Sequence, residues 1–308
     1  MTAQPRAVER VIQPTPVIEG AGVRLRRSIA TATLDYLDPF LLLDNFQSDD
    51  PDDYLAGFPW HPHRGIETVT YMLAGEVDHR DSIGNAGMIG AGDVQWMTAG
   101  GGIMHEEMPR PGADGHMGGF QLWVNLPAEL KMTKPRYQDL SAAQVPKVRR
   151  ADGTVIRVVA GVVDGVGGAV TEIYAEPEYL DVSLPAGANF AQPVPLGHAA
   201  FAYAFEGEGQ FGVGCDLGYR GDLDGALLSS PRMAVFGDGD EVRVEARDHA
   251  VRFLLVSGKP LGEPIARYGP FVMNTREELQ FALRDLQNDT FVWRDDADWA
   301  RSRRTWVR

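Results

Sequence analysis

Three histidines and one glutamate stand out in the sequence because of their spacing. His61 and His63 form a His-x-His pair, and His105 and Glu107 form a His-x-Glu pair about forty residues later. Alternate side chains of an extended strand share a face, so the two residues of each pair point the same way. Two such strands facing each other would hold three imidazoles and a carboxylate around one point, which predicts a metal site.

The types of these side chains indicate the chemistry of the site. Imidazole binds Fe, Zn, Cu, Ni and Mn, and a carboxylate oxygen shifts the preference away from metals that favour thiolates. Four protein ligands around an octahedral ion leave two adjacent positions open, which an oxygenase needs for a chelating substrate and dioxygen. Structural zinc sites are usually rich in cysteine, whereas the single Cys215 of this chain is distant in sequence from the histidines.

The sequence offers two candidates for the carboxylate. Glu107 shares a strand face with His105. Glu67 lies four residues after His63 and therefore on the same face if the strand continues, which makes it a competing ligand or a hydrogen-bond partner that holds an imidazole. Two nearby polar residues are interpreted as structural or rim residues: His79 and Asp81.

The elements that must position these residues are predicted to be strands. Phe40 to Phe46 is an apolar run too short for a helix, residues 67–73 alternate strongly, and Val94 to Thr98 is a further strand. The run Gly100 to Gly102 lacks the Lys and Ser/Thr of a phosphate loop and is interpreted as a turn that allows close approach to the site. Short strands at regular spacing, with Gly and Pro turns, predict a sandwich or barrel.

The two halves of the 308-residue chain look like diverged copies. An alignment of Gly92-Asp93 with Gly239-Asp240 sets Arg252 and Leu254 opposite His105 and Glu107, so the second copy lacks the ligands. We therefore predict one metal site. The expected division is a metal-binding domain (1–135), a proline-interrupted linker (136–153), a degenerate domain without a metal site (154–262) and a C-terminal tail (263–308).

The tail contains a predicted helix over residues 275–287. Thr275 and Glu278 have the spacing of a capping box, in which each side chain satisfies a free backbone N–H. An apolar stripe at helical spacing follows: Leu279, Ala282, Leu283 and Leu286. This helix is expected to pack on a barrel.

Charge and composition restrict the partners. The formal net charge of -14 argues against direct nucleic-acid binding, because affinity for phosphates comes largely from Lys and Arg. The exception, residues 301–308 with four Arg, is interpreted as a solvated tail or an ion-pairing partner of the acidic body. No apolar leader or 18-residue apolar window is present, which with the single Cys215 predicts a cytoplasmic protein without a membrane segment. Closed barrels hide their edges, so a monomer is expected.

Several longer segments give the chain its resemblance to a known family. They are Pro39 to Asp44, Phe58 to Gly65, Glu67 to Tyr71, Asp81-Ser82, Gly92 to Gly100, Gly102 to Pro109 and Gly269 to Thr275. With these segments the chain resembles the pirin family of the cupin superfamily. The resemblance implies an all-β bicupin of two β-barrels (double-stranded β-helices), with iron in the N-terminal barrel. It implies His61, His63, His105 and Glu107 as ligands, which removes Glu67 from that role.

The resemblance also implies two functional hypotheses. Pirin-like proteins are associated with quercetin 2,3-dioxygenase activity. In this hypothesis a flavonol chelates Fe2+, and Glu107 takes its hydroxyl proton if it swings off the metal. Candidates for the apolar pocket walls, chosen for nearness in sequence, are Phe58, Trp60, Met97 and Met104. The alternative is a non-catalytic, iron-dependent redox sensor that acts through a protein partner. A polar, poorly formed pocket would favour the sensor.

Overall fold

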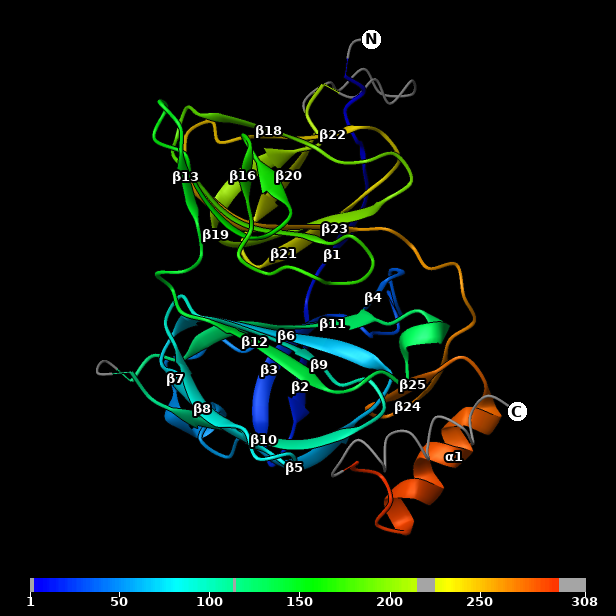
Figure 1. Ribbon diagram of the computed structural model, residues 1–308. Coiled ribbons are helices and arrows are strands. Elements are labelled where there is room, and N and C mark those ends of the chain that lie inside the picture. The colour runs from blue at the N-terminus through cyan, green and yellow to red at the C-terminus, as the bar shows by residue number, and fades with distance from the viewer. Residues whose placement is uncertain (1–2, 113–114, 215–224, 294–308) are drawn as a thin grey trace. The chain divides into compact units, whose positions relative to one another are not determined.

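The computed structural model describes residues 3–112, 115–214 and 225–293. They fold mostly into strands, in two compact units that each contain a β-barrel (Figure 1). The first barrel is the unit of Pro16–Ala30, Phe40–Ala142 and the chain from Leu261. The second barrel is the unit of Met1–Thr15, Thr31–Pro39 and Ala143–Pro260. The predicted all-β class is confirmed.

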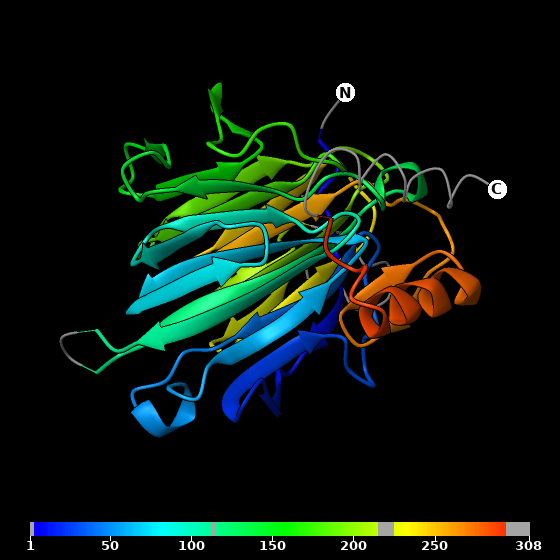
Figure 2. The ribbon, with the colours of Figure 1, turned by 60° about the horizontal axis from the view of Figure 1, so that its bottom comes forward.

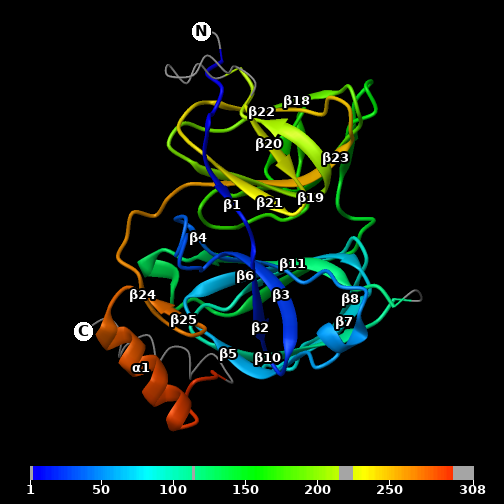
Figure 3. The same ribbon diagram turned by 180° about the vertical axis from the view of Figure 1, so that it is seen from behind.

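The first barrel consists of a seven-stranded and a four-stranded sheet, and Figure 3 shows its strands β2 and β3 from behind. The larger sheet has the order β12 (Arg136–Leu140), β9 (Val94–Thr98), β6 (Ile66–Ala74), β11 (Gly118–Asn125), β4 (Phe40–Asn45), β3 (Val23–Ile29) and β2 (Thr15–Glu19). The smaller has the order β5 (Phe58–His63), β10 (Ile103–Arg110), β7 (Glu76–Asp81) and β8 (Ala86–Gly90). Two 3-10 turns, η1 (Pro51–Asp53) and η2 (Ala128–Leu130), connect strands.

The burial of the central strands explains their sequences. Every residue of β4 and of β9 is buried, including four polar ones: Asp44, Asn45, Gln95 and Thr98. The first seven residues of β6 are buried as well, so its alternation separates two buried faces rather than an inner face from solvent.

The second barrel is built on a ten-stranded sheet. Its strands are β1 (Val8–Ile12), β13 (Lys147–Arg149), β14 (Val155–Ala160), β17 (Glu178–Leu184), β18 (Asn189–Pro193), β19 (Ala199–Phe211), β20 (Ala226–Ser229), β21 (Arg232–Phe236), β22 (Glu241–Glu245) and β23 (Val251–Gly258). A separate hairpin pairs β15 (Val162–Val163) with β16 (Val166–Gly167). The interior of the second barrel is an apolar cluster, in which the ring of Phe253 meets those of Phe190 and Phe211 edge to face.

The C-terminal part of the described chain belongs to the first barrel unit. The hairpin of β24 (Ala266–Tyr268) and β25 (Phe271–Met273) leads into α1 (Arg276–Gln287), and Figure 2 shows this helix in orange beside the hairpin. Thr275 caps the helix and forms the predicted capping box with Glu278. The predicted apolar stripe packs on the hairpin, with Leu279 and Ala282 buried. The predicted helix and its packing are confirmed.

The residues predicted as a linker contain two strands. Within 136–153, β12 pairs with β9 of the first barrel and β13 pairs with β14 of the second. Both strands lie at the edge of their sheets, where a proline beside the strand interrupts no internal ladder. The prolines of this region therefore accompany edge strands.

Two sequence predictions concern residues outside the described ranges. They are the Arg-rich end, 301–308, and Cys215. Within the described ranges, no helix combines the length and hydropathy needed to cross a membrane.

Candidate metal centre

The three predicted histidines come together on two neighbouring strands. β5 and β10 pair antiparallel, and this register sets His105 opposite His61 and Ile103 opposite His63. The strands therefore lie side by side in one sheet instead of facing each other. The imidazole centroids are 4.8 Å apart for His61 and His63, 4.3 Å for His61 and His105, and 5.0 Å for His63 and His105. One ligand atom from each residue lies within 4.8 Å of the others.

The surroundings of these imidazoles suit a cation. Burial, reinforced by the neighbouring imidazoles, holds the pKa of His63 and His105 well below the usual range of histidine, so both rings are neutral at pH 7. Nδ1 of His63 and both ring nitrogens of His105 are buried without a hydrogen-bond partner. Nδ1 of His61 lies 3.0 Å from the carbonyl oxygen of Pro59. Because buried polar atoms rarely lack partners, the unpartnered nitrogens fit a divalent transition metal.

Glu107 lies in the wall of the same cavity as His61 and His63. Its side chain is buried, and Thr70 Oγ1 can donate its single proton to Glu107 Oε1 at 3.3 Å or to Gln121 Oε1 at 2.8 Å. Burial raises the pKa of Glu107 to about 7. The close group of ligand atoms contains the three imidazoles, so Glu107 as the fourth ligand remains a prediction.

Glu67 is placed elsewhere, because His63 and Glu67 belong to different strands. The chain turns at Gly65, where φ is +79°, and β5 and β6 lie in different sheets. Glu67 is three residues from Thr70 on β6, so the two side chains point to opposite faces. Glu67 Oε1 accepts a hydrogen bond of 2.7 Å from Thr98 Oγ1. The expectation that Glu67 shares a strand face with His63 was wrong, because the chain turns at Gly65 between two strands.

The residues across the ladder from the candidate ligands are buried. His79 pairs with Glu107 and Asp81 pairs with His105 in the register of β7 and β10. The carboxylate of Asp81 accepts hydrogen bonds from the backbone of Ile83 and Asn85, so its role is structural, as predicted. His79 is 5% exposed and stacks on Tyr137.

His61 and His63 open onto a cavity of about 590 Å³ inside the first barrel. Most of its walls are apolar: Val23, Leu25, Leu42, Phe46, Tyr54, Phe58, Val77, Met117 and Trp123. The indole of Trp123 meets His63 edge to face at 5.2 Å. Sequence reasoning missed Trp123 because its strand, β11, is distant in sequence from both histidine pairs.

Of the four wall residues predicted from nearness in sequence, the cavity contains Phe58. Trp60 is 44% exposed and its ring lies 5.7 Å from the guanidinium carbon of Arg80. Met97 and Met104 pack into two separate apolar clusters of the same unit. Nearness along the chain fails for Trp60 and Met104 because successive residues of a strand face opposite sides, and each directly precedes a candidate ligand.

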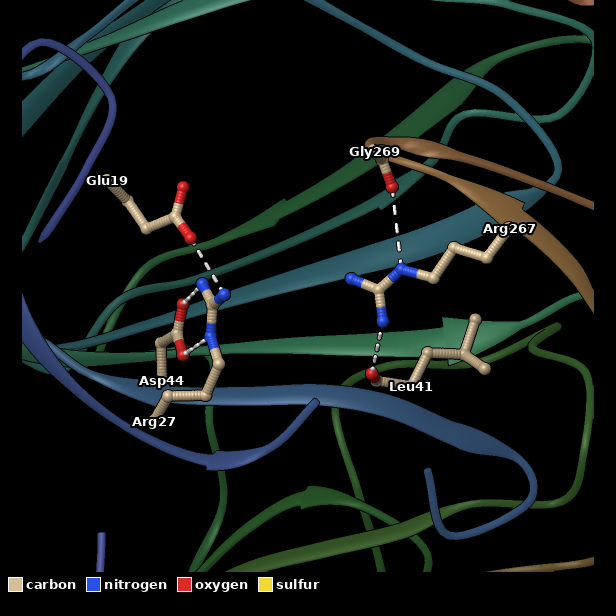
Figure 4. A network of polar contacts seen from close by, with 6 residues as sticks. All are labelled: Glu19, Arg27, Leu41, Asp44, Arg267 and Gly269. Carbon is tan, nitrogen blue, oxygen red and sulfur yellow. Dashed lines mark hydrogen bonds and ion pairs between the residues drawn. The ribbon is translucent and has the colours of Figure 1, made fainter. Parts of the chain in front are cut away.

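A charged network forms the polar part of the cavity wall (Figure 4). Arg27 binds Asp44 through two hydrogen bonds, of 2.8 and 2.7 Å, and Glu19 through one of 2.7 Å. Burial raises the pKa of Asp44 to about 6, although Arg27 opposes this shift. Arg267 donates to the carbonyl oxygen of Leu41, and its guanidinium carbon lies 5.0 Å from the ring of Trp123. No motif in the sequence indicated these residues.

The strands of the second barrel that correspond to β5 and β10 carry apolar residues instead. β22 pairs with β18 and with the end of β19, as β10 pairs with β5 and β7, so β22 is the counterpart of β10. Arg252 and Leu254 lie on β23, so the alignment that set them opposite His105 and Glu107 had the wrong register. Phe190 of β18 and Val242 and Val244 of β22 join the apolar core. Within the described residues, the three histidines form the single cluster with metal-ligand spacing.

The comparisons with known proteins agree with this architecture. A family model described as Pirin matches residues 22–124, and a second, described as Pirin C-terminal cupin domain, matches residues 179–292. The chain belongs to the pirin family. This pirin is therefore a bicupin, as the resemblance implied.

Individual relatives extend the comparison over most of the chain. This pirin is 45% identical to a protein of Pseudomonas aeruginosa that is named provisionally as a quercetin 2,3-dioxygenase, over 89% of this chain and 93% of that protein. It is also 45% identical to a pirin-like protein of Caulobacter vibrioides, over 93% of this chain and 99% of that protein. The crystal structure of a quercetin 2,3-dioxygenase from Acinetobacter baumannii matches with a TM-score of 0.81 and 33% identity, over 94% of this chain and 100% of that chain.

Proposed function

We propose that this pirin is a metal-dependent dioxygenase that cleaves quercetin or a related flavonol at a mononuclear Fe2+ site. The observation that carries the proposal is a cluster of three imidazoles, two of them buried, beside a mostly apolar cavity of about 590 Å³. A cavity of this size and lining is typical of a small-molecule site. The redox-sensor hypothesis called for a polar, poorly formed pocket, so the cavity favours the enzyme.

His61, His63, His105 and Glu107 would hold the metal. When bound, Fe2+ would offer two open positions and lower the pKa of a chelated hydroxyl, as metals do for bound water. The ligand set alone accepts Mn, Ni, Cu or Zn as well, and the names of the two quercetin dioxygenases above support the choice of a flavonol.

The protein's own groups would bind and orient the flavonol. The aromatic walls, Phe46, Phe58 and Trp123, match flat rings and exclude water from the centre. If it left the metal, Glu107 would accept the proton of the substrate hydroxyl at a carboxylate oxygen; in the metal-free site, burial raises its pKa to about 7. Thr70 Oγ1, which lies 3.3 Å from Glu107 Oε1 and 2.8 Å from Gln121 Oε1, would help to hold the Glu107 carboxylate toward the cavity when its single proton is directed to Glu107.

The test is oxygen uptake and loss of quercetin absorbance by anaerobically purified, Fe2+-loaded protein. We expect metal-dependent turnover that His63→Ala abolishes. The matched control is His249→Ala, which removes an exposed histidine of the second barrel unit and should retain activity. Stoichiometric metal without oxygen uptake would exclude quercetin as the substrate and would favour the sensor hypothesis.

A further inference from the structure

The C-terminal segment, defined here as residues 266–293, contacts the chain directly after His63. The backbone of Val272 donates to the carbonyl oxygen of Arg64 at 3.1 Å, and Arg64 and Phe271 form an isolated parallel β-bridge. The amide of Arg64 donates to the carbonyl oxygen of Pro270 at 3.4 Å. The backbone after one metal-binding strand is therefore hydrogen-bonded to the hairpin of β24 and β25.

The approach of the two chains is closest at Gly65. A β-carbon at this position would lie 2.0 Å from the carbonyl oxygen of Val272, so only glycine fits. Lys131 joins both chains, because its Nζ donates to the carbonyl oxygens of Gly65 and Val272, each at 3.0 Å. The turn after His63 is therefore held from two sides.

The side chain of Arg64 reaches further into the C-terminal segment. It is fully buried, and its Nη1 forms an ion pair of 2.7 Å with Oδ2 of Asp285 on α1. Its guanidinium carbon lies 4.4 Å from the ring centroid of Phe291. Removing one partner of such an ion pair leaves the other charge buried without a partner, which strongly destabilises the fold. The position of Arg64, the residue after His63, therefore depends on where α1 packs.

The same segment covers the chain directly before His105. At Gly102, which precedes β10, a β-carbon would lie 2.7 Å from the carbonyl oxygen of Phe291. Met104, the neighbour of His105, packs on the cluster that contains Phe271, Met273 and Phe291. One segment, distant in sequence from both, therefore contacts the flanks of both histidine strands.

We propose that the C-terminal segment is a clasp that sets the positions of His63 and His105, with Asp285 as a positioning residue for the metal. The inference rests on the metal centre of the proposed function and does not require flavonol turnover. Coupling between two binding equilibria is reciprocal. If docking of the clasp strengthens metal binding, then bound metal must strengthen docking of the clasp by the same factor.

The first experiment compares the full chain with Asp285→Asn. Co2+ binding is followed by visible absorption against a competing chelator, and hydrogen exchange of residues 276–291 is followed with and without Co2+. We expect Asp285→Asn to weaken Co2+ binding by roughly tenfold, within the usual range of such couplings. In the wild-type chain, saturating Co2+ should slow exchange of this segment by a comparable factor, and His63→Ala should show no such slowing.

The matched control is Asp289→Asn, which makes the same change at an exposed position just beyond α1 and should leave both readouts unchanged. Should the Asp285→Asn chain fail to fold, Phe291→Leu removes the ring beneath Arg64 without stranding a charge and serves the same comparison. The effect of Co2+ on exchange in the wild-type chain needs no variant.

Faster hydrogen exchange of residues 276–291 in Asp285→Asn with unchanged Co2+ affinity would overturn the clasp. Hydrogen exchange in the wild-type chain that does not change when Co2+ binds would overturn it as well. A wild-type chain that binds no Co2+ would overturn both the clasp and the metal centre. Coupled Co2+ binding without quercetin turnover would uphold the clasp while excluding the proposed reaction.

Discussion

At the scale of single residues, the central question is which carboxylate binds the metal. Glu107 lies in the cavity wall and Glu67 points to the opposite face of β6, toward Thr98. We predict that Glu107→Gln weakens Co2+ binding by roughly 10- to 100-fold and abolishes quercetin turnover, because the amide is a poor ligand and takes no proton. Titration with Co2+ and oxygen uptake measure the two effects.

Glu67→Gln is the matched comparison for this prediction. It makes the same change at a buried glutamate three residues from Thr70, and its amide oxygen can still accept the hydrogen bond from Thr98. We expect the Co2+ affinity of Glu67→Gln to stay within about twofold of wild type, because the Glu67 side chain does not orient the predicted ligands. The reverse order of the two variants would identify Glu67 as the ligand.

At the scale of elements, period-two alternation predicted much of the site. Each His-containing pair lies on a strand, and the apolar run Phe40 to Phe46 corresponds to β4. The capping box of Thr275 could also be predicted, because it depends on two residues that lie three positions apart in sequence. Where the chain turns was harder to predict: the break at Gly65 depends on the close approach of Val272, about two hundred residues away in sequence. Long-range contacts of this kind leave no local pattern.

The network at Lys131 is another such long-range feature, and it permits a stability test. Lys131 is 1% exposed, and its Nζ also donates a hydrogen bond of 2.7 Å to Asn125 Oδ1. Lys131→Met keeps the length of the side chain but leaves buried acceptors without a donor, which costs about 1–3 kcal/mol for each unsatisfied group. We predict a clear fall in the melting temperature of the first barrel, measured by calorimetry.

The control for Lys131→Met is the same substitution at Lys134, an exposed lysine three residues further along the chain. We expect the melting temperature of Lys134→Met to stay close to that of wild type, because exposed substitutions usually have small effects. Equal shifts for the two variants would show that the hydrogen bonds of Lys131 contribute little.

At the scale of the whole molecule, two barrels of one family carry different interiors. The first holds three imidazoles beside a cavity, whereas β18 and β22 of the second contribute to an apolar core. We predict one Co2+ per chain. Removal of metal by a chelator should destabilise the first barrel by about 3 kcal/mol if free metal was at 100 times its dissociation constant. Hydrogen exchange should quicken in β5 and β10 and stay unchanged in β22 and β23.

The second barrel has its own titratable group. Glu178, at the start of β17, is half-buried, and its Oε2 accepts a hydrogen bond of 2.8 Å from Gln192 of β18. Burial raises the pKa of Glu178 to about 8, whereas a glutamate in an unfolded chain has a pKa near ~4.3. Between these two values the folded state binds more protons than the unfolded state. The stability that Glu178 contributes is therefore present below the unfolded pKa and lost as pH rises through 8.

Glu178→Gln removes this proton and can still accept the hydrogen bond from Gln192. We predict that its melting temperature relative to wild type rises steadily between pH 5 and 8, since a single proton changes stability by about 1.4 kcal/mol per pH unit. Glu9→Gln makes the same charge change at an exposed position of the same unit and serves as the control. Parallel melting curves for wild type and Glu178→Gln across this range would mean that Glu178 is already ionised in the folded barrel. In that case its carboxylate must be stabilised by contacts beyond Gln192, and the apolar surroundings of β17 would not govern its charge.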